Sequence, residues 1–181
     1  SSVNVALPAM GKEFGMNAVL LSWVPTSYLL AAAMFLVPFG RIADIHGRKR
    51  IFAIGIVVYT AASSLIVLAP SVTVLLALRV LQGFGSAMIF GTGIAIVTSV
   101  FPPADRGRVL GLNVSAVYVG LSLGPFLGGF LTQQFGWRSI FLANVPAGIV
   151  ALFFIVRRLK GEWAEARGER FDTGGALIYA V

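Results

Sequence analysis

Two long runs without a charged residue, 14–40 and 51–78, most constrain what this chain can fold into. Each exceeds the ~20 residues that an α-helix needs to cross the hydrocarbon core of a bilayer. Between them, segment 40–50 carries five charged residues, which is expected of a short connection at a membrane surface. The runs do not alternate between apolar and polar residues, as the strands of a membrane β-barrel do. The sequence therefore predicts an all-α membrane protein with several spans.

Composition supports this class. Hydrophobic residues make up 57% of the chain and charged residues 12%, against roughly 45–50% and 25% in soluble domains. The net charge of +7 does not indicate nucleic-acid binding, because the basic residues lie between apolar runs and not on one face of a soluble fold. The absence of cysteine excludes disulfides and cysteine-ligated metals. We predict no metal site and no cofactor.

The apolar pattern predicts six spans and the beginning of a seventh. The expected spans are 1–10, which is the end of a first span, then 19–40, 51–69, 72–100, 109–133, 139–156 and 173 onward. The chain then divides into an N-terminal transmembrane bundle over 1–157, a polar linker over 158–172 and the start of a seventh span over 173–181.

The distribution of basic residues predicts the orientation. Most Lys and Arg residues fall in the connections 41–50 and 101–108 and around 158–172, whereas the opposite side holds only Lys12 and Arg138. Basic residues concentrate on the cytoplasmic side of membrane proteins. We expect a multi-pass protein of the cell (inner or plasma) membrane with those three segments in the cytoplasm.

Arg79 is the most informative single residue. It lies about seven residues inside the predicted fourth span, where an arginine costs on the order of 3 kcal/mol on insertion scales. Gln82 and Ser86 follow at i+3 and i+7, so they share one helical face with Arg79. The pattern indicates a polar stripe that faces the bundle interior or a cavity. The alternative is an arginine that reaches outward to the membrane surface.

Small residues at spacings of four mark the fourth and fifth spans. They are Gly83, Ala87 and Gly91 in the fourth, and Gly120, Gly124 and Gly128 in the fifth, with Pro125 and Gly129 beside them. Such stripes let helix backbones approach closely in lipid. Simple tight packing and a deformable seam between moving helices are both compatible with this spacing.

Asp44 and Arg48 are i, i+4 partners if the second helix continues that far. An acid at the C-terminal end of a helix is disfavoured by the macrodipole. We therefore expect Asp44 to need a further partner, with Arg106 and Arg108 as candidates within this chain.

Several enzyme signatures are absent. The sequence has no Gly-x-x-x-x-Gly-Lys-Ser/Thr phosphate loop, no His-Glu-x-x-His metal site and no acid pair within a span. We predict a transporter or channel segment and not an enzyme. A membrane scaffold or sensor is the alternative from another class, although a scaffold has no evident need for a buried arginine.

These motifs resemble the major facilitator superfamily. Gly40, Asp44, Gly47, Arg48 and Lys49 match its signature Gly-x-x-x-Asp-Arg-x-Gly-Arg-Arg/Lys, with Ile45 in place of the arginine. Segment 78–87 resembles a second signature, Arg-x-x-Gln-Gly-x-Gly, and 120–129 resembles the antiporter signature Gly-x-x-x-Gly-Pro-x-x-Gly-Gly. Segments 3–8 and 171–175 resemble the flanks of the first and seventh spans in fourteen-span drug/proton antiporters.

The resemblance implies an N-terminal six-helix half of a secondary transporter that works by alternating access. The implied partners are a small-molecule substrate, protons, the bilayer and the C-terminal half of the same chain; the energy source is a proton gradient. The implied substrates are drugs or other lipophilic or cationic compounds, with a dedicated exporter of a metabolite, siderophore or antibiotic as the alternative. Family members usually carry a membrane acid in the first span, at a position that falls upstream of Ser1.

The resemblance also assigns roles to residues. Proton coupling or cavity residues are Arg79, Gln82, Ser86 and Asn4. Cytoplasmic gate residues are Gly40, Asp44, Gly47, Arg48, Lys49, Arg106 and Arg108. Antiporter seam residues are Gly120, Gly124, Pro125, Gly128 and Gly129.

Overall fold

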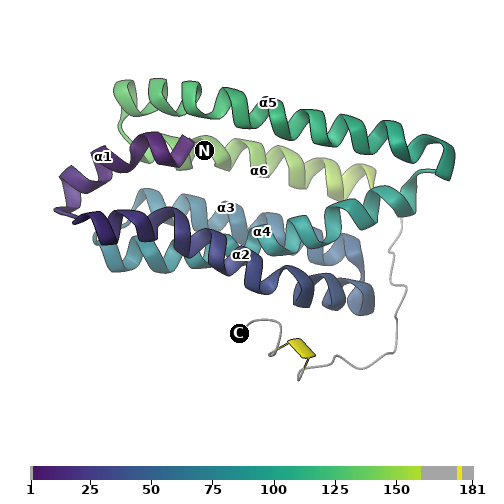
Figure 1. The fold of residues 1–181 in the computed structure, drawn as a ribbon. Helices are drawn as coiled ribbons and strands as arrows, with labels where there is room; N and C mark the ends of the chain where they lie inside the picture. Colours follow the sequence, from purple (N-terminus) through teal and green to yellow (C-terminus); the bar gives the residue numbers. More distant parts are fainter. Residues whose placement is uncertain (1, 160–174, 177–181) are drawn as a thin grey trace.

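Six α-helices account for almost all of the first 159 residues. The computed structural model describes residues 2–159 and 175–176. The helices are α1 (Ser2–Phe14), α2 (Ala18–His46), α3 (Arg48–Val67), α4 (Val72–Val100), α5 (Pro103–Phe135) and α6 (Arg138–Arg158) (Figure 1).

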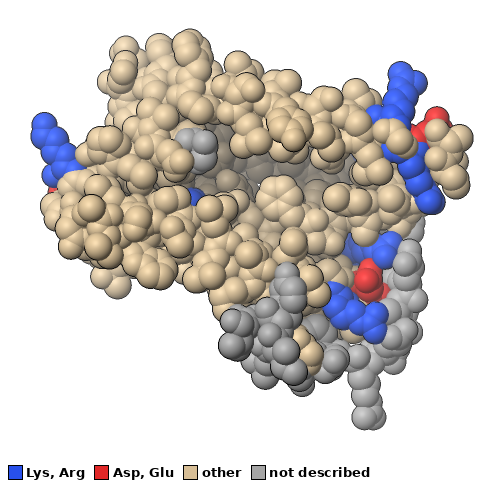
Figure 2. Space-filling view, viewed as in Figure 1, with Lys and Arg blue, Asp and Glu red and all other residues tan. Residues whose placement is uncertain are grey.

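All of these helices except α1 are long and apolar enough to cross a membrane. In Figure 2, Lys and Arg side chains lie at the two ends of the visible face, and uncharged side chains cover almost all of the belt between them. The helices run along the long axis of this belt (Figure 1). The predicted fold class, an all-α membrane bundle, is confirmed.

Helix α4 lies at the centre of the bundle, against α2 and α3, while α6 packs on α3 and α5 on α1. Glycines bring α4 onto both neighbours. A Cβ added to Gly83 would lie 2.6 Å from the Tyr28 carbonyl oxygen of α2, and one on Gly91 would lie 2.9 Å from the Leu36 carbonyl oxygen. On the other side, a Cβ on Gly85 would lie 2.6 Å from the Tyr59 backbone nitrogen of α3. The small residues of the fourth span therefore serve close backbone packing.

The predicted connection at 11–18 is too long. Helix α1 continues through Pro8 to Phe14, and α2 begins at Ala18 after Asn17, whose side chain accepts a hydrogen bond of 2.9 Å from the Leu20 N–H. The prediction assumed that the polar residues in this segment interrupt the helix. The chain instead turns at Gly15, where φ is +61°, a conformation that glycine adopts without steric penalty.

The charged segments 41–50 and 101–108 were predicted as loops, but apart from Gly47, Phe101 and Pro102 their residues are helical. Helix α2 runs to His46 and α3 starts at Arg48, so Gly47, with φ of +108°, makes the whole turn. Likewise α5 already begins at Pro103, where proline suits a first helical turn. Charged residues place a helix end at the membrane surface but do not unwind it. The predicted linker beyond Leu159 and the predicted seventh span lie outside the described residues, apart from 175–176.

Candidate functional site: a cavity beside a buried arginine

The Arg79 side chain points into the bundle and is only 5% exposed. Its Nε donates a hydrogen bond of 2.9 Å to the Val24 carbonyl oxygen of α2, and Nη1 donates one of 2.5 Å to Gln82 Oε1. The guanidinium carbon lies 4.4 Å from the centre of the Tyr28 ring, within the range of a cation–π interaction. The outward-reaching alternative for Arg79 is therefore wrong.

A chain of buried hydrogen bonds continues from Arg79. Gln82 Nε2 donates to Ser63 Oγ of α3 over 2.8 Å, and the Tyr28 hydroxyl and Ser86 Oγ lie 2.7 Å apart. Gln82 and Ser86 are nearly fully buried. The polar stripe predicted on α4 thus exists, and it joins α2, α3 and α4 through interactions that are expensive to leave unmade in a low-dielectric interior.

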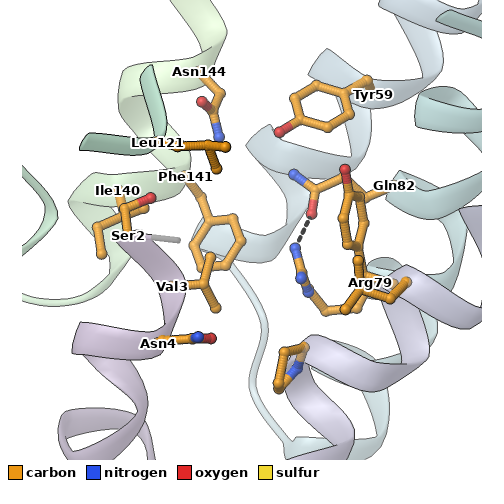
Figure 3. Close-up of a pocket in the computed structure, with 13 residues that line it drawn as sticks. Ser2, Val3, Asn4, Tyr59, Arg79, Gln82, Leu121, Ile140, Phe141 and Asn144 are labelled. Carbon is orange, nitrogen blue, oxygen red and sulfur yellow. Dashed lines mark hydrogen bonds between the residues drawn. The ribbon is translucent and has the colours of Figure 1, made fainter. Parts of the chain in front are cut away.

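Arg79 and Gln82 line a cavity of about 370 Å³. Figure 3 shows Arg79, Gln82 and Tyr59 on one side of the cavity and Asn4, Phe141 and Asn144 on the other. All six helices contribute; the lining residues are Ser2, Val3, Asn4, Pro25, Tyr28, Leu29, Tyr59, Arg79, Gln82, Leu121, Ile140, Phe141 and Asn144. We call this the Arg79 cavity. It contains Asn4, as the sequence predicted, and Ser86 stands behind it, hydrogen-bonded to Tyr28.

Arg79 supplies the only formal charge among the lining residues that the structure describes. Carbonyl and amide dipoles and the ring faces of Tyr28 and Phe141 stabilise the cation in place of a carboxylate. A desolvated charge of this kind is typical of a path for a substrate, an ion or a proton. The arrangement can hold a polar group at Arg79 and an apolar body against the rings.

Sequence reasoning missed several cavity residues, namely Tyr28, Tyr59, Phe141 and Asn144. Asn144 could have been predicted from the sequence, because a polar amide inside an apolar span indicates a functional site in the same way as an intramembrane arginine. The aromatic residues carried none, since tyrosine and phenylalanine are common on any membrane helix.

A second polar cluster lies at the end of the bundle where α2 meets α3. Arg48 is 7% exposed and donates from Nε to Asp44 Oδ1 over 2.8 Å, while its Nη1 donates to Ser99 Oγ of α4 over 2.8 Å. The i, i+4 pair predicted for Asp44 and Arg48 is therefore present. Ser99, which the sequence did not indicate, ties the pair to α4.

The remaining predicted gate residues surround this cluster without all joining it. Gly40 packs against α4 at Gly91, and Gly47 makes the turn, where its N–H donates to the Ala43 carbonyl oxygen over 2.8 Å. Lys49 lies half-buried on the first turn of α3. Arg106 donates to the Phe101 carbonyl oxygen over 3.0 Å and Arg108 is exposed. The structure pairs Asp44 with Arg48, and a further partner from Arg106 or Arg108 stays a prediction.

For the transporter that the resemblance implies, we expect Asp44→Asn to lower the transport rate of the full-length protein severalfold with little change in its amount in the membrane. The asparagine keeps the side-chain shape but loses the charge that offsets the buried Arg48 guanidinium. Initial uptake rates in everted vesicles, normalised to protein amount, provide the measurement. His46→Gln, a change at an exposed position on the same turn, is the matched control. Unchanged transport in Asp44→Asn would make this cluster a topological anchor only.

The predicted seam on α5 contacts the described chain at one end only. A Cβ on Gly128 would lie 2.6 Å from Ser2 Cβ of α1, whereas Gly124 has its nearest neighbour at 3.8 Å and Gly120 has none within 4 Å. Pro125 is exposed and Gly129 lies 3.6 Å, measured from a built Cβ, from Val5. Gly128 therefore allows α1 and α5 to touch, Gly124 is in ordinary contact with the start of α1, and Gly120 has open space beside it in the described chain.

The opposite end of the bundle carries a cluster that we call the outer clasp, formed by Glu13, Trp137 and Arg138. Trp137 Nε1 donates to Glu13 Oε2 over 2.7 Å, and Arg138 Nη1 lies 2.7 Å from Glu13 Oε1. Arg138 also donates from Nε to the Val67 carbonyl oxygen of α3 over 2.9 Å and stacks on the Trp137 ring. The clasp thereby ties the ends of α1, α3 and α6 together.

Glu13 lies beyond the apolar part of α1. Its pKa is lowered below the ordinary value of 4.5 by hydrogen bonds from Trp137, which has the larger effect, and from Arg138. A lowered folded-state pKa means that the clasp stabilises the fold above pH 4.5 and that this contribution is lost as the pH falls through the folded-state pKa. We expect Glu13→Gln to reduce the melting temperature of the purified full-length protein by a few degrees at pH 7. The difference from wild type should shrink below pH 4.5, and Lys12→Gln, on the neighbouring exposed residue, should change little. A constant difference across this pH range would contradict the assignment.

The helices and the buried polar cavity define a multi-pass helical membrane protein. A sequence model of the Major Facilitator Superfamily matches residues 1–177, so the chain belongs to that superfamily of transporters. The match points to a transporter and not an enzyme, and to a multi-pass protein of the inner membrane.

Similar proteins include several named as exporters. The chain is 39% identical to "Multidrug resistance protein Stp" of Mycobacterium tuberculosis (strain ATCC 25618 / H37Rv), over 99% of this chain and 33% of that protein. It is 38% identical to "Cephamycin export protein CmcT" of Amycolatopsis lactamdurans, over 98% of this chain and 37% of the relative. It is 31% identical to "Riboflavin transporter RibZ" of Clostridioides difficile (strain 630), over 99% of this chain and 40% of the relative. The chain thus spans between about a third and two fifths of the length of these relatives.

Proposed function

We propose that the full-length protein is a proton-coupled exporter of drugs or other lipophilic or cationic small molecules that works by alternating access. The observation that carries this proposal is the buried Arg79 guanidinium in a cavity to which every helix contributes. A charge so placed costs stability, and a role toward a substrate, an ion or a proton explains why the chain carries it. The proposal treats residues 1–157 as one half of the transporter, followed by a linker over 158–172 and a seventh span from 173.

The charge of Arg79 supports a role in coupling. A nearby acid would be held ionised by the guanidinium, and protonation of that acid would change the attraction between the two. In this proposal Gln82 and Ser86 hold the α4 face in position, because they fix Arg79 and Tyr28 through hydrogen bonds. The acid itself would come from outside residues 1–181, in the family pattern from just upstream of Ser1.

The two clusters outside the cavity receive supporting roles. The Asp44, Arg48 and Ser99 cluster would hold the cytoplasmic ends of α2, α3 and α4 together in one transport state. The exposed part of the α5 stripe, Gly120 and Pro125, would lie against the second half of the protein. Its lack of side-chain bulk would let that contact slide as the halves rock.

Everted membrane vesicles that contain the full-length protein test the coupling. We expect energised vesicles to accumulate ethidium, a cationic probe, and to release it when nigericin collapses the pH gradient. Vesicles prepared without the protein serve as the control for leakage and dye binding. Accumulation that does not depend on the imposed pH gradient would refute proton coupling.

A dedicated metabolite or antibiotic exporter is the second candidate, and the names of the relatives favour it. One relative is named for riboflavin and another for cephamycin. A panel of ethidium, riboflavin and a cephamycin separates the two candidates. Export of one compound alone supports the dedicated exporter, and export of several chemically unlike compounds supports the multidrug exporter.

A further inference from the structure

A second cavity, of about 280 Å³, lies between α3, α4 and α6. We call it the α3–α6 pocket; its lining residues are Phe52, Ile56, Tyr59, Thr60, Ile89, Asn144, Ala147, Gly148 and Ala151. Tyr59 and Asn144 line the Arg79 cavity as well. These two side chains therefore stand between the two cavities. In Figure 3 they face each other at one edge of the Arg79 cavity, with the Tyr59 hydroxyl directed toward the side of Asn144.

Apart from the shared edge and Thr60, the residues that line the α3–α6 pocket are apolar. They are Phe52, Ile56, Ile89, Ala147, Gly148 and Ala151. The small side chains of α6 leave the space open, and Ala147 is itself exposed on the surface of the bundle. An apolar opening at the depth of the hydrocarbon core admits hydrocarbon and aromatic groups more readily than water.

The depth of the pocket in the bilayer follows from its lining. Phe52 lies one turn after the start of α3 at Arg48, and Ala151 lies about two turns before the end of α6 at Arg158. Both of those helix ends lie on the side that the basic residues mark as cytoplasmic. The pocket therefore occupies the cytoplasmic half of the bilayer and ends near mid-membrane, at Tyr59 and Asn144.

The shared edge is not held by hydrogen bonds among the described residues. Within the described part of the chain, neither the Tyr59 hydroxyl nor the Asn144 amide is held by a hydrogen bond, and both residues are only partly buried. Both side chains can therefore change rotamer without breaking a hydrogen bond. Arg79 and Gln82, in contrast, are fixed by several bonds. Hydrogen bonds within the described chain therefore hold the Arg79 network in place but do not hold the two side chains that separate the cavities.

We infer that the α3–α6 pocket is a side entrance through which apolar aromatic molecules dissolved in the cytoplasmic half of the bilayer reach the Arg79 cavity, with Tyr59 and Asn144 as the gate. A molecule on this path exchanges hydrocarbon for an apolar lining and then meets polar groups at the gate. Use of the entrance in export rests on the proposed function, but passage through it does not require transport.

Thiol labelling measures that passage. The 181-residue sequence contains no cysteine, so Asn4→Cys, in a full-length protein freed of any other cysteine, places one thiol in the Arg79 cavity. The probe is N-phenylmaleimide, an uncharged aromatic reagent that partitions into bilayers. Labelling is followed in proteoliposomes without any gradient. We compare Ala151→Phe, which fills the pocket, with Val150→Phe, a matched change on the exposed neighbouring position outside both cavities.

If the pocket is an entrance, Ala151→Phe slows labelling by N-phenylmaleimide severalfold and Val150→Phe does not. Labelling by a water-soluble cationic methanethiosulfonate should be the same in both variants, which shows that the fold and the aqueous path are intact. Equal N-phenylmaleimide rates in the two variants overturn the inference. If Ala151→Phe does not insert, Ala147→Phe, at the exposed mouth, makes the same comparison. Slowed labelling in a protein that exports nothing would refute the proposed function and keep the entrance.

Discussion

Arg79→Ala is expected to reduce export by about 10- to 100-fold while the full-length protein still accumulates in the membrane. Hydrogen bonds of a charged group contribute roughly 1.5–3 kcal/mol each, which corresponds to rate changes of that size if they act in the transport step. Stability should change less. Removing the arginine loses its bonds to Val24 and Gln82 but also removes a desolvated charge that pairs with no carboxylate among the lining residues described.

Arg79→Lys separates charge from geometry. Lysine keeps the positive charge but lacks the planar fork that donates to Val24 and Gln82 at the same time. We expect export between that of wild type and Arg79→Ala, measured as the initial rate in everted vesicles with protein amount determined in parallel. Thr98→Val, on the same helix and outside the Arg79 cavity, controls for a general effect of altering α4. Wild-type export in Arg79→Ala would show that the guanidinium is not needed and would favour a structural role.

The sequence predicted the spans because the bilayer leaves few choices. A span must be apolar, long enough and helical, and these demands are visible without any tertiary information. The fourth span was predicted as 72–100 and is Val72–Val100. The inward direction of Arg79 was predictable for the same reason, since a charge in hydrocarbon leaves few alternatives.

The connections were harder to predict because charge and helix formation are separate properties. Residues such as Arg41 and Asp44 are charged and also helical, so the helix end had to be read from Gly47 and not from the charges. The outer clasp was out of reach, because Glu13 and Trp137 are far apart in sequence and meet only through the packing of α1 and α6. The cavity lining likewise depends on which helices converge, which spacing within one helix does not reveal. The same limit applies to the α5 stripe, whose spacing was visible but whose neighbours were not.

The contact between α3 and α4 positions the side chains that these two helices contribute to the Arg79 cavity. Tyr59 and Ser63 project from α3, and the Gln82 bond to Ser63 spans the helix pair. Gly85 and Gly55 lie at the crossing, where a Cβ on either would come within 2.9 Å of the other residue's carbonyl oxygen. Without glycine at the crossing, the side chains of α3 could not reach Gln82.

Gly85→Ala should therefore destabilise the full-length protein and reduce its export together. The added methyl group meets the Tyr59 backbone nitrogen at 2.6 Å, and backbone cannot rotate away as a side chain can. Overpacking of this kind costs typically ~1–3 kcal/mol. In lipid, helices associate through packing and not through the hydrophobic effect, so little compensates for the lost contact. The measurements are the melting temperature in detergent and the amount of protein in the membrane.

Gly93→Ala is the matched control, because it makes the same change on the same helix where the nearest atom, Phe52 Cε2, is 3.8 Å from the new Cβ. Alanine favours a helix over glycine by about 1 kcal/mol, so Gly93→Ala should be neutral or stabilising. The two variants differ in whether the added methyl group meets the backbone of α3. If they melted at the same temperature, α3 and α4 would have to lie farther apart than the structure places them, and the bond from Gln82 to Ser63 could not hold Arg79 in its cavity.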